Sequence, residues 1–283
     1  ESREIEMSDQ QKKNAGEAAA AHVEAGMVVG LGTGSTAAWF VKALAARGLD
    51  GLRCVPTSEA TAELARELGL TLSTLEDTPR IDLTVDGADE IGPGLALIKG
   101  GGAALLREKL VWEASARCIV IADAAKVVPV LGIFPLPIEV VAFGHKTTAN
   151  RIADVLADHD IAMPARVRSA ERGLVRTDGG NLIYDAKCAA IHDPVRLADD
   201  LKLITGVVEH GLFHRAIDIK QRDRIAAFLV AAKLEVGDVD LGIAERRAHE
   251  ADHARHVGIG DVDHVGADIG IHVDALDLDE ARL

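Results

Sequence analysis

The first half of the chain alternates between short apolar runs and stretches with helical spacing, and this alternation limits the possible folds more than any other feature. The apolar runs occupy residues 27–31, 52–56, 81–85 and 118–122. The helical stretches occupy residues 14–23, 37–46, 58–68 and 103–116. Apolar strands separated by amphipathic helices are typical of a mainly parallel sheet with helices on both faces. The sequence therefore predicts an α/β fold with a Rossmann-like sheet, which binds ligands at the carboxyl ends of its strands.

The middle of the chain has a different order of elements. After a break at Pro135 and Pro137, the pattern predicts a strand, a helix capped by Thr147 or Thr148, two strands, a second helix and a last strand. Residues 178–181, Asp-Gly-Gly-Asn, are a strong hairpin turn signal. A β-α-β-β-α-β order is that of a small ferredoxin-like module. We therefore expect a second, smaller α+β domain.

These patterns suggest three parts of the chain. Residues 1–134 are expected to form a Rossmann-like catalytic domain that residues after 209 complete, and residues 135–209 the small ferredoxin-like domain. Residues 214–283 are an atypical C-terminal segment, in which residues 224–234 favour an amphipathic helix. From residue 248 onward no helical stripe is present. His249 and His253 have a spacing that metals can use, but without further ligands we expect a solvated tail.

Composition narrows the range of partners. The formal net charge of −14 argues against nucleic acid and against an anionic membrane surface. It leaves room for an anionic small molecule, because a few lysines and backbone amides can form a local positive pocket. No apolar run approaches the ~18 residues of a membrane span, and the polar N-terminal stretch lacks the apolar core of a secretory signal. The three cysteines are far apart, so we expect a reducing, cytoplasmic location.

Residues 32–36, Gly-Thr-Gly-Ser-Thr, lie between a predicted strand and a predicted helix. Their unblocked amides, their hydroxyls and the helix N-terminus suit a phosphate or another oxyanion. The alternative is a tight turn in which Ser35 or Thr36 caps the helix. The glycine spacing matches neither the P-loop nor the dinucleotide-binding fingerprint.

Residues 86–90, Asp-Gly-Ala-Asp-Glu, place three carboxylates directly after a predicted buried strand. Crowded carboxylates raise one another's pKa, which suits proton transfer near neutral pH. A magnesium site is a competing use for the same oxygens, and a solvated surface turn is the simplest alternative.

Residues 99–109, Lys-Gly-Gly-Gly-Ala-Ala-Leu-Leu-Arg-Glu-Lys, are the strongest single feature. Three consecutive glycines are costly in conformational entropy, and they are expected where the backbone approaches a ligand closely. Lys99 precedes the glycines, and Glu108 lies on the helix that follows them. Taken alone, Glu108 could equally be a solvated helix residue.

The three motifs occur together, in this order, and in this combination the chain resembles the ribose-5-phosphate isomerase A family. The similarity also takes in Thr57-Ser58 and residues 122–126 and 134–140, and it runs from about Lys12 to about Phe213. Residues 214–283 have no match, and a change of reading frame near residue 213 is one explanation.

The resemblance implies site residues. Glu108 matches the catalytic base of the family, and Asp86, Asp89 and Lys99 match its polar active-site residues. The residues that match substrate and phosphate contacts are Lys12, Thr33, Gly34, Ser35, Thr36, Gly100, Gly101, Gly102 and Lys126. The resemblance further implies a small-molecule sugar phosphate as partner, no metal or organic cofactor, and a homodimer or homotetramer.

The implied activity is the interconversion of D-ribose 5-phosphate and D-ribulose 5-phosphate, a step of the pentose phosphate pathway. A carboxylate base, Glu108, would move a proton between neighbouring carbons through an enediolate. Lys99 and the glycine amides would stabilise the oxyanion, and Asp86, with Asp89, would handle hydroxyl protons and ring opening. The phosphate would serve as a remote handle whose binding positions the reacting carbons.

Three other functions are open. An amino-sugar-phosphate deaminase on a related fold is opposed by the complete Lys-Gly-Gly-Gly block. A non-catalytic sugar-phosphate sensor is opposed by the presence of both Glu108 and Lys99 and by the lack of a basic nucleic-acid-binding segment. A nicotinamide-dependent enzyme is opposed by the missing fingerprint glycines.

Overall fold

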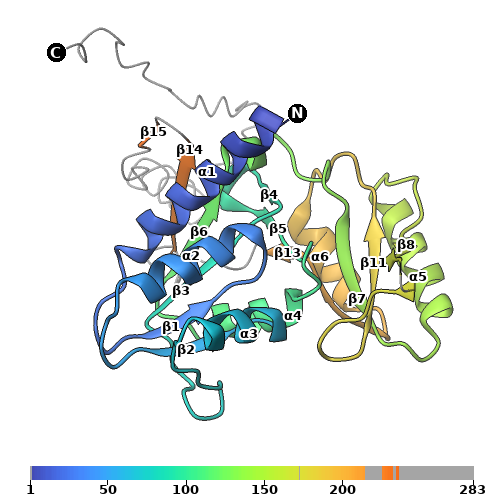
Figure 1. Ribbon diagram of the computed structural model, residues 1–283. Helices are drawn as coiled ribbons and strands as arrows, with labels where there is room; N and C mark the ends of the chain where they lie inside the picture. The colour runs from blue at the N-terminus through green and yellow to red at the C-terminus, as the bar shows by residue number, and fades with distance from the viewer. Residues whose placement is uncertain (1, 172, 214–224, 232–233, 236–283) are drawn as a thin grey trace, which may run out of the picture. The chain divides into compact units, whose positions relative to one another are not determined.

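The computed structural model describes residues 2–171, 173–213, 225–231 and 234–235 (Figure 1). Nearly all of the C-terminal segment at 214–283, including His249 and His253, therefore lies outside the described residues. Within the described part of the chain, no helix combines the length and the apolar character that a membrane crossing requires.

A six-stranded sheet forms the centre of the larger part of the fold, and it confirms the predicted α/β class. Its strands are β1 (Val28–Leu31), β2 (Arg53–Pro56), β3 (Leu83–Gly87), β6 (Cys118–Ala122), β14 (Ile225–Ala231) and β15 (Leu234–Glu235). The order is β15-β14-β6-β3-β1-β2, and only the β14–β15 pairing is antiparallel. The chain runs outward from β1 to β2 and then returns to β3. This reversal creates a switch point between β1 and β3, where sheets of this kind bind ligands.

Helices cover both faces of this sheet, which explains why its central strands are mainly apolar. They are α1 (Ser2–Ala20), α2 (Ser35–Ala46), α3 (Glu59–Glu67) and α4 (Leu105–Glu113). Figure 1 shows α1 and α2 side by side, and Phe40 of α2 packs in one core with Val29 of β1. The neighbouring strand residue Val28 packs in another core with Val111 of α4. Successive strand residues therefore point to opposite, equally buried faces.

A four-stranded antiparallel sheet forms the smaller part, with the predicted ferredoxin-like order of elements. Its elements in chain order are β7 (Leu136–Val140), α5 (His145–Asp158), β8 (Arg166–Val167), β11 (Leu182–Ala186), α6 (Pro194–Lys202) and β12 (Val207–His210). The strand order is β12-β7-β11-β8. A short hairpin of β9 (Ser169–Ala170) and β10 (Gly173–Leu174) is inserted between β8 and β11. Ile138, Ile152 and Leu201 are fully buried in the core between sheet and helices.

A third, three-stranded sheet connects the end of the small part to the region of the site. Its strands are β4 (Glu90–Ile91), β5 (Leu97–Ile98) and β13 (Leu212–Phe213), all antiparallel. Two short 3₁₀ helices, η1 (Pro93–Leu95) and η2 (Ala124–Lys126), lie in the connections. Just before β13, the Gly211 carbonyl accepts a hydrogen bond from the Lys99 amide at 2.9 Å.

Two local predictions were wrong. Helix α5 begins at His145, after Gly144 in the left-handed region at φ 67°, so neither Thr147 nor Thr148 is its cap. The stretch 224–234 contains strand β14 instead of a helix, paired in parallel with β6. An apolar run of this length suits a strand or a buried helix equally well, and the open edge of β6 decides between them.

We expect Gly211→Ala to destabilise the protein by about 1–3 kcal/mol, because a Cβ at this position would overpack its surroundings. That Cβ would lie 2.2 Å from the Lys99 carbonyl oxygen and 2.8 Å from the Pro137 ring. Chemical denaturation measures the change. Gly179→Ala is the matched control, since its Cβ would meet nothing closer than 3.5 Å. Equal stability of the two variants would contradict the close approach at Gly211.

Candidate active site

Asp86, Lys99 and Glu108 meet in the interior at the carboxyl end of β3. Asp86 belongs to β3, Lys99 follows β5 directly, and Glu108 lies in the first turn of α4. Lys99 Nζ is 3.0 Å from Asp86 Oδ2 and 3.5 Å from Glu108 Oε2. The exposed fractions of the three residues are only 0%, 2% and 3%. The fold thus brings three predicted site residues from three different elements into one buried cluster.

Backbone groups hold the cluster in place, and two of its carboxylate oxygens lack a hydrogen-bond partner among the described residues. Asp86 Oδ1 accepts hydrogen bonds from the amides of Thr33 at 3.1 Å and Gly87 at 2.7 Å. Lys99 Nζ donates to the Gly87 carbonyl. Among the described residues, Asp86 Oδ2 and Glu108 Oε2 have no hydrogen-bond partner, although each lies near the Lys99 ammonium. Buried polar atoms are normally satisfied, so such exceptions point to a function.

Burial raises the pKa of both carboxylates, and neighbouring negative charge raises that of Glu108 further. Burial raises the pKa of Glu108 to about 8, the negative charges of Asp86 and Asp89 add to the increase, and Lys99 opposes it. Burial likewise raises the pKa of Asp86 above its usual range, against the opposing effect of Lys99. Burial alone would lower the pKa of Lys99, but the charges of Asp86 and Glu108 outweigh it and raise this pKa. A carboxylate whose pKa lies near neutral suits a general base.

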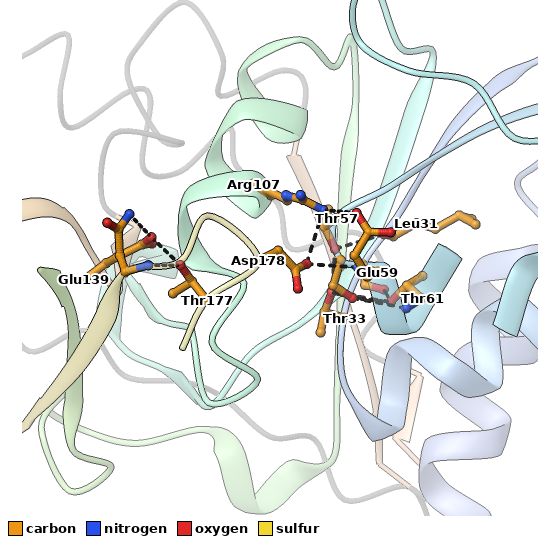
Figure 2. Close-up of polar contacts among 12 residues, drawn as sticks. Leu31, Thr33, Thr57, Glu59, Thr61, Arg107, Glu139, Thr177 and Asp178 are labelled. Carbon is orange, nitrogen blue, oxygen red and sulfur yellow. Dashed lines mark hydrogen bonds and ion pairs between the residues drawn. The ribbon is translucent and has the colours of Figure 1, made fainter. Parts of the chain in front are cut away.

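Gly32 is the position that lets β1 and β3 approach closely enough for this arrangement. A Cβ there would lie 2.2 Å from Asp86 Oδ1. After Gly32, the Thr33 hydroxyl lies 2.7 Å from that of Thr57 and 2.9 Å from that of Ser58. Figure 2 shows Thr33, Thr57 and Thr61 gathered in this polar group. The predicted loop and the Thr57-Ser58 pair therefore lie together at the switch point.

The N-terminus of α2 follows the same loop. Its N-cap is Gly34, and no side chain caps the helix, so neither Ser35 nor Thr36 has the capping role considered above. Gly34 and Ser35 are exposed, and Thr36 is half-buried. The first amides of an uncapped helix can bind an anion.

The triglycine loop, residues 100–102, lies beside the loop at residues 32–36, which we call the Thr33 loop. The Gly101 amide donates to Asp89 Oδ2 at 2.8 Å, so Asp89, which directly precedes β4, supports the loop. Gly101 and Gly102 are exposed. A Cβ on Gly102 would lie 3.0 Å from Thr33 Cγ2, which shows how closely the two loops approach.

The three carboxylates of residues 86–90 do not converge. Asp86 faces Lys99, and Asp89 accepts from Gly101. Glu90 is buried and accepts from the amides of Gly132 and Phe134. Among the described residues, no group of three or more His, Cys, Asp or Glu side chains is arranged to hold a metal ion.

Two lysines that were predicted to contact the substrate have their described contacts with residues outside the buried cluster. Lys126 ends η2, and its ammonium lies 5.9 Å from the ring centre of Phe134. Lys12 lies on α1, and its ammonium is 3.6 Å from Asp9. The roles of Lys12 and Lys126 in binding a phosphate stay predictions.

Residues of the small sheet that reach the site were missed from the sequence. In the hairpin turn before β11, Asp178 Oδ2 accepts from the Glu59 amide at 2.9 Å and lies 3.2 Å from Arg107 Nη1 (Figure 2). Buried Glu139 of β7 holds this turn by accepting from the Thr177 hydroxyl at 2.8 Å. The turn was predicted, but no local pattern reveals its distant partners.

A second contact with the small sheet lies beside Glu108. Lys109 Nζ is 2.7 Å from Glu209 Oε1 of β12. Burial lowers the pKa of Lys109 to about 8. Burial would raise the pKa of Glu209, but the Lys109 charge outweighs it and lowers this pKa to about 2. The pair is therefore mainly ionised at neutral pH and ties α4 to β12.

The fold and the site define an α/β enzyme with a buried cluster of one lysine and two carboxylates, placed at a sheet switch point beside an uncapped helix N-terminus. Comparison with known proteins gives the family. The family model for ribose 5-phosphate isomerase A (phosphoriboisomerase A) matches residues 53–220. This chain belongs to the ribose-5-phosphate isomerase A family.

Individual relatives agree with this assignment. Ribose-5-phosphate isomerase A of Caulobacter vibrioides is 71% identical over 206 residues, which cover 73% of this chain and 90% of the relative. The Agrobacterium fabrum protein of the same name is 52% identical, covering 72% and 89%. A D-ribose-5-phosphate isomerase solved in complex with phospho-erythronic acid is 37% identical, with a TM-score of 0.70 and coverage of 79% and 95%. The Plasmodium falciparum ribose 5-phosphate isomerase structure is 36% identical, with a TM-score of 0.68 and coverage of 72% and 90%.

We expect Asp86→Asn to move the acidic limb of the pH profile of kcat/KM to lower pH. If Glu108 is the base, it must be deprotonated, so activity should fall as pH drops through the pKa of Glu108. Replacing Asp86 removes a negative charge that helps to raise the pKa of Glu108. The positive charge of Lys99 then acts on Glu108 without that opposing charge, so the pKa of Glu108 should fall. Isomerase assays across pH measure the limb. The exposed Asp77→Asn serves as control, and an unmoved limb in Asp86→Asn would contradict the charge coupling.

Proposed function

We propose that this chain interconverts D-ribose 5-phosphate and D-ribulose 5-phosphate with Glu108 as the base. The isomerase activity follows from membership of the family. The observation that supports the role of Glu108 is its burial beside Lys99, with an unpaired oxygen and a pKa raised to about 8. Asp86 is also buried beside Lys99 with an unpaired Oδ2 and a raised pKa, but the amides of Thr33 and Gly87 hold its other oxygen.

The proposed step moves one proton between two carbons. Glu108 takes the proton from C2 of the open-chain aldose, and the electrons of that bond form the C1–C2 double bond while O1 becomes negative. The same carboxyl group then returns the proton to C1, and the O2 proton moves to O1. The product is the ketose, with no net change in atoms or electrons.

The enediolate oxygens need positive charge that is already in place. Lys99 is proposed to supply it, together with the amides of Gly100, Gly101 and Gly102. Asp86, with Asp89, is proposed to carry the hydroxyl protons and to assist ring opening. The support is position: Lys99 lies 3.0 Å from Asp86, and Asp89 holds the amide of Gly101.

The phosphate is proposed to bind at residues 33–36, where the N-terminus of α2 lacks a side-chain cap. Thr33, Gly34, Ser35 and Thr36 offer amides and hydroxyls there, and Lys126 and Lys12 are proposed to add positive charge. Phospho-erythronic acid, present in a related isomerase structure, has a phosphate and a carboxylate that resembles an enediolate. It is the ligand we expect this site to bind.

The broader organisation is also proposed. Residues 1–134 and 135–209 act as catalytic and small domains, supported by their separate sheets. The protein is also proposed to form a homodimer or homotetramer. A cytoplasmic location is proposed as well, and three free, buried cysteines support it. A deaminase or a non-catalytic sensor is not favoured, because the relatives that match are named as isomerases.

The test is the formation of ribulose 5-phosphate from ribose 5-phosphate with EDTA present. We expect Glu108→Gln to lower kcat by roughly a thousandfold or more, since it removes a general base but keeps the shape of the side chain. Glu113→Gln is the matched control, because Glu113 lies on the same helix and is exposed.

Near-normal activity of Glu108→Gln would exclude Glu108 as the base and move attention to Asp86 and Asp89. A folded wild-type protein that does not isomerise ribose 5-phosphate would contradict the reaction itself. Loss of activity in both Glu108→Gln and Glu113→Gln would show damage to α4 instead of loss of a base.

A further inference from the structure

Arg168 of the small part contacts the backbone of the triglycine loop. Its Nη1 donates to the Gly100 carbonyl at 3.1 Å and to the Gly101 carbonyl at 2.9 Å. These contacts join residues 67 and 68 positions apart in the chain. One guanidinium therefore binds two consecutive carbonyls of a loop that contains no side chains of its own.

Arg168 is itself held firmly. Its Nε donates to Asp185 Oδ2 at 2.8 Å, and its Nη2 donates to Asp185 Oδ1 at 2.5 Å. Its amide donates to the Ile183 carbonyl at 2.7 Å, and its carbonyl accepts from Val175 at 3.0 Å. A two-pronged pairing with a carboxylate fixes the plane of a guanidinium as well as its position. Arg168 therefore connects β11, through Asp185 and Ile183, to the triglycine loop.

The positions of these bonds matter for the loop amides. The Gly101 carbonyl belongs to the same peptide unit as the Gly102 amide, and the Gly100 carbonyl shares its unit with the Gly101 amide. A positive charge at a carbonyl oxygen polarises that unit and strengthens its N–H as a donor. The Gly101 amide is used by Asp89. In the described part of the chain the Gly102 amide has no hydrogen-bond partner, and a Cβ on Gly102 would lie 3.0 Å from Thr33 Cγ2, so this residue approaches the loop at residues 32–36.

We propose that Arg168, oriented by Asp185, is a positioning residue of the reaction: it fixes the triglycine loop and polarises the Gly102 amide toward the enediolate oxygen. This inference rests on the proposed function and adds a residue from the small part to the catalytic machinery. The small part is then more than a stabilising attachment, because it sets the geometry of the oxyanion site. Arg168 does not touch the substrate in this proposal.

The proposal predicts a specific kinetic pattern. Arg168→Ala should lower kcat by roughly tenfold, less than the 10²–10³-fold cost of deleting an oxyanion donor outright, because the amide remains. KM for ribose 5-phosphate should change little, since the phosphate binds elsewhere. Inhibition by phospho-erythronic acid should weaken in proportion to kcat/KM, whereas inhibition by inorganic phosphate should stay the same. A merely structural role would not separate the two inhibitors.

Two further variants protect the test against misfolding. Arg168→Lys keeps the charge but cannot bind both carbonyls and Asp185 together, and Asp185→Asn loosens Arg168 without removing it. Both should show the same pattern to a smaller degree, with unchanged thermal unfolding midpoints. Arg196→Ala is the matched control, because Arg196 lies in the same part and its guanidinium makes, among the described residues, only a largely exposed ion pair with Asp200 at 3.7 Å.

The outcomes are distinct. Unchanged kcat in folded Arg168 and Asp185 variants would overturn the proposal, and so would an equal loss of affinity for both inhibitors. If the wild-type protein is inactive or Glu108→Gln stays active, the proposed function fails first and the role of Arg168 falls with it. If Arg168→Ala does not fold, Arg168→Lys and Asp185→Asn decide.

Discussion

The buried ion pairs of Lys99 with Asp86 and Glu108 are the constraint on which the rest of the site depends. An ammonium and two carboxylates removed from water are each costly, and removing one leaves the others uncompensated. The arrangement holds only if β3, β5 and α4 keep their relative positions. The hydrogen bond between Lys99 and Gly211 and the close approach of Gly32 to Asp86 serve this purpose.

Three residues of the smaller, ferredoxin-like part contact the elements that carry this cluster or lie beside it. Asp178 binds the start of α3 and Arg107, Glu209 pairs with Lys109, and Arg168 holds the triglycine loop. Arg107 and Lys109 flank Glu108 on α4, so the helix that carries this proposed base is fixed on both sides of it. Pairs that are partly exposed, such as Arg107 with Asp178, contribute little stability individually. Their main effect is on position, which acid–base chemistry requires to within fractions of an ångström.

Much of the fold was predictable because local patterns carried it. The alternation of residues 27–122 predicted the parallel sheet, and the turn at residues 178–181 predicted a hairpin in the smaller module. Prediction failed where a distant partner decided the outcome. Residues 225–231 pair with β6 as a strand. The predicted cap of α5 was wrong for a local reason, because Gly144 in the left-handed region directly precedes the helix and is its N-cap. The crowding of Asp86, Asp89 and Glu90 was visible, but their separate partners were not.

The sequence by itself determined the family, the order of the motifs and the chemical types available at the site, because glycines, lysines and carboxylates at strand ends have few other uses. Only the tertiary structure decided which of these groups meet. Asp86, Lys99 and Glu108 lie close together in the chain, yet only folding brings the ends of β3 and β5 and the first turn of α4 to one place. The raised pKa of Glu108 has the same origin, since burial and neighbouring charge exist only after folding. Arg168 gave no local signal, because its partners are backbone carbonyls, which every sequence contains.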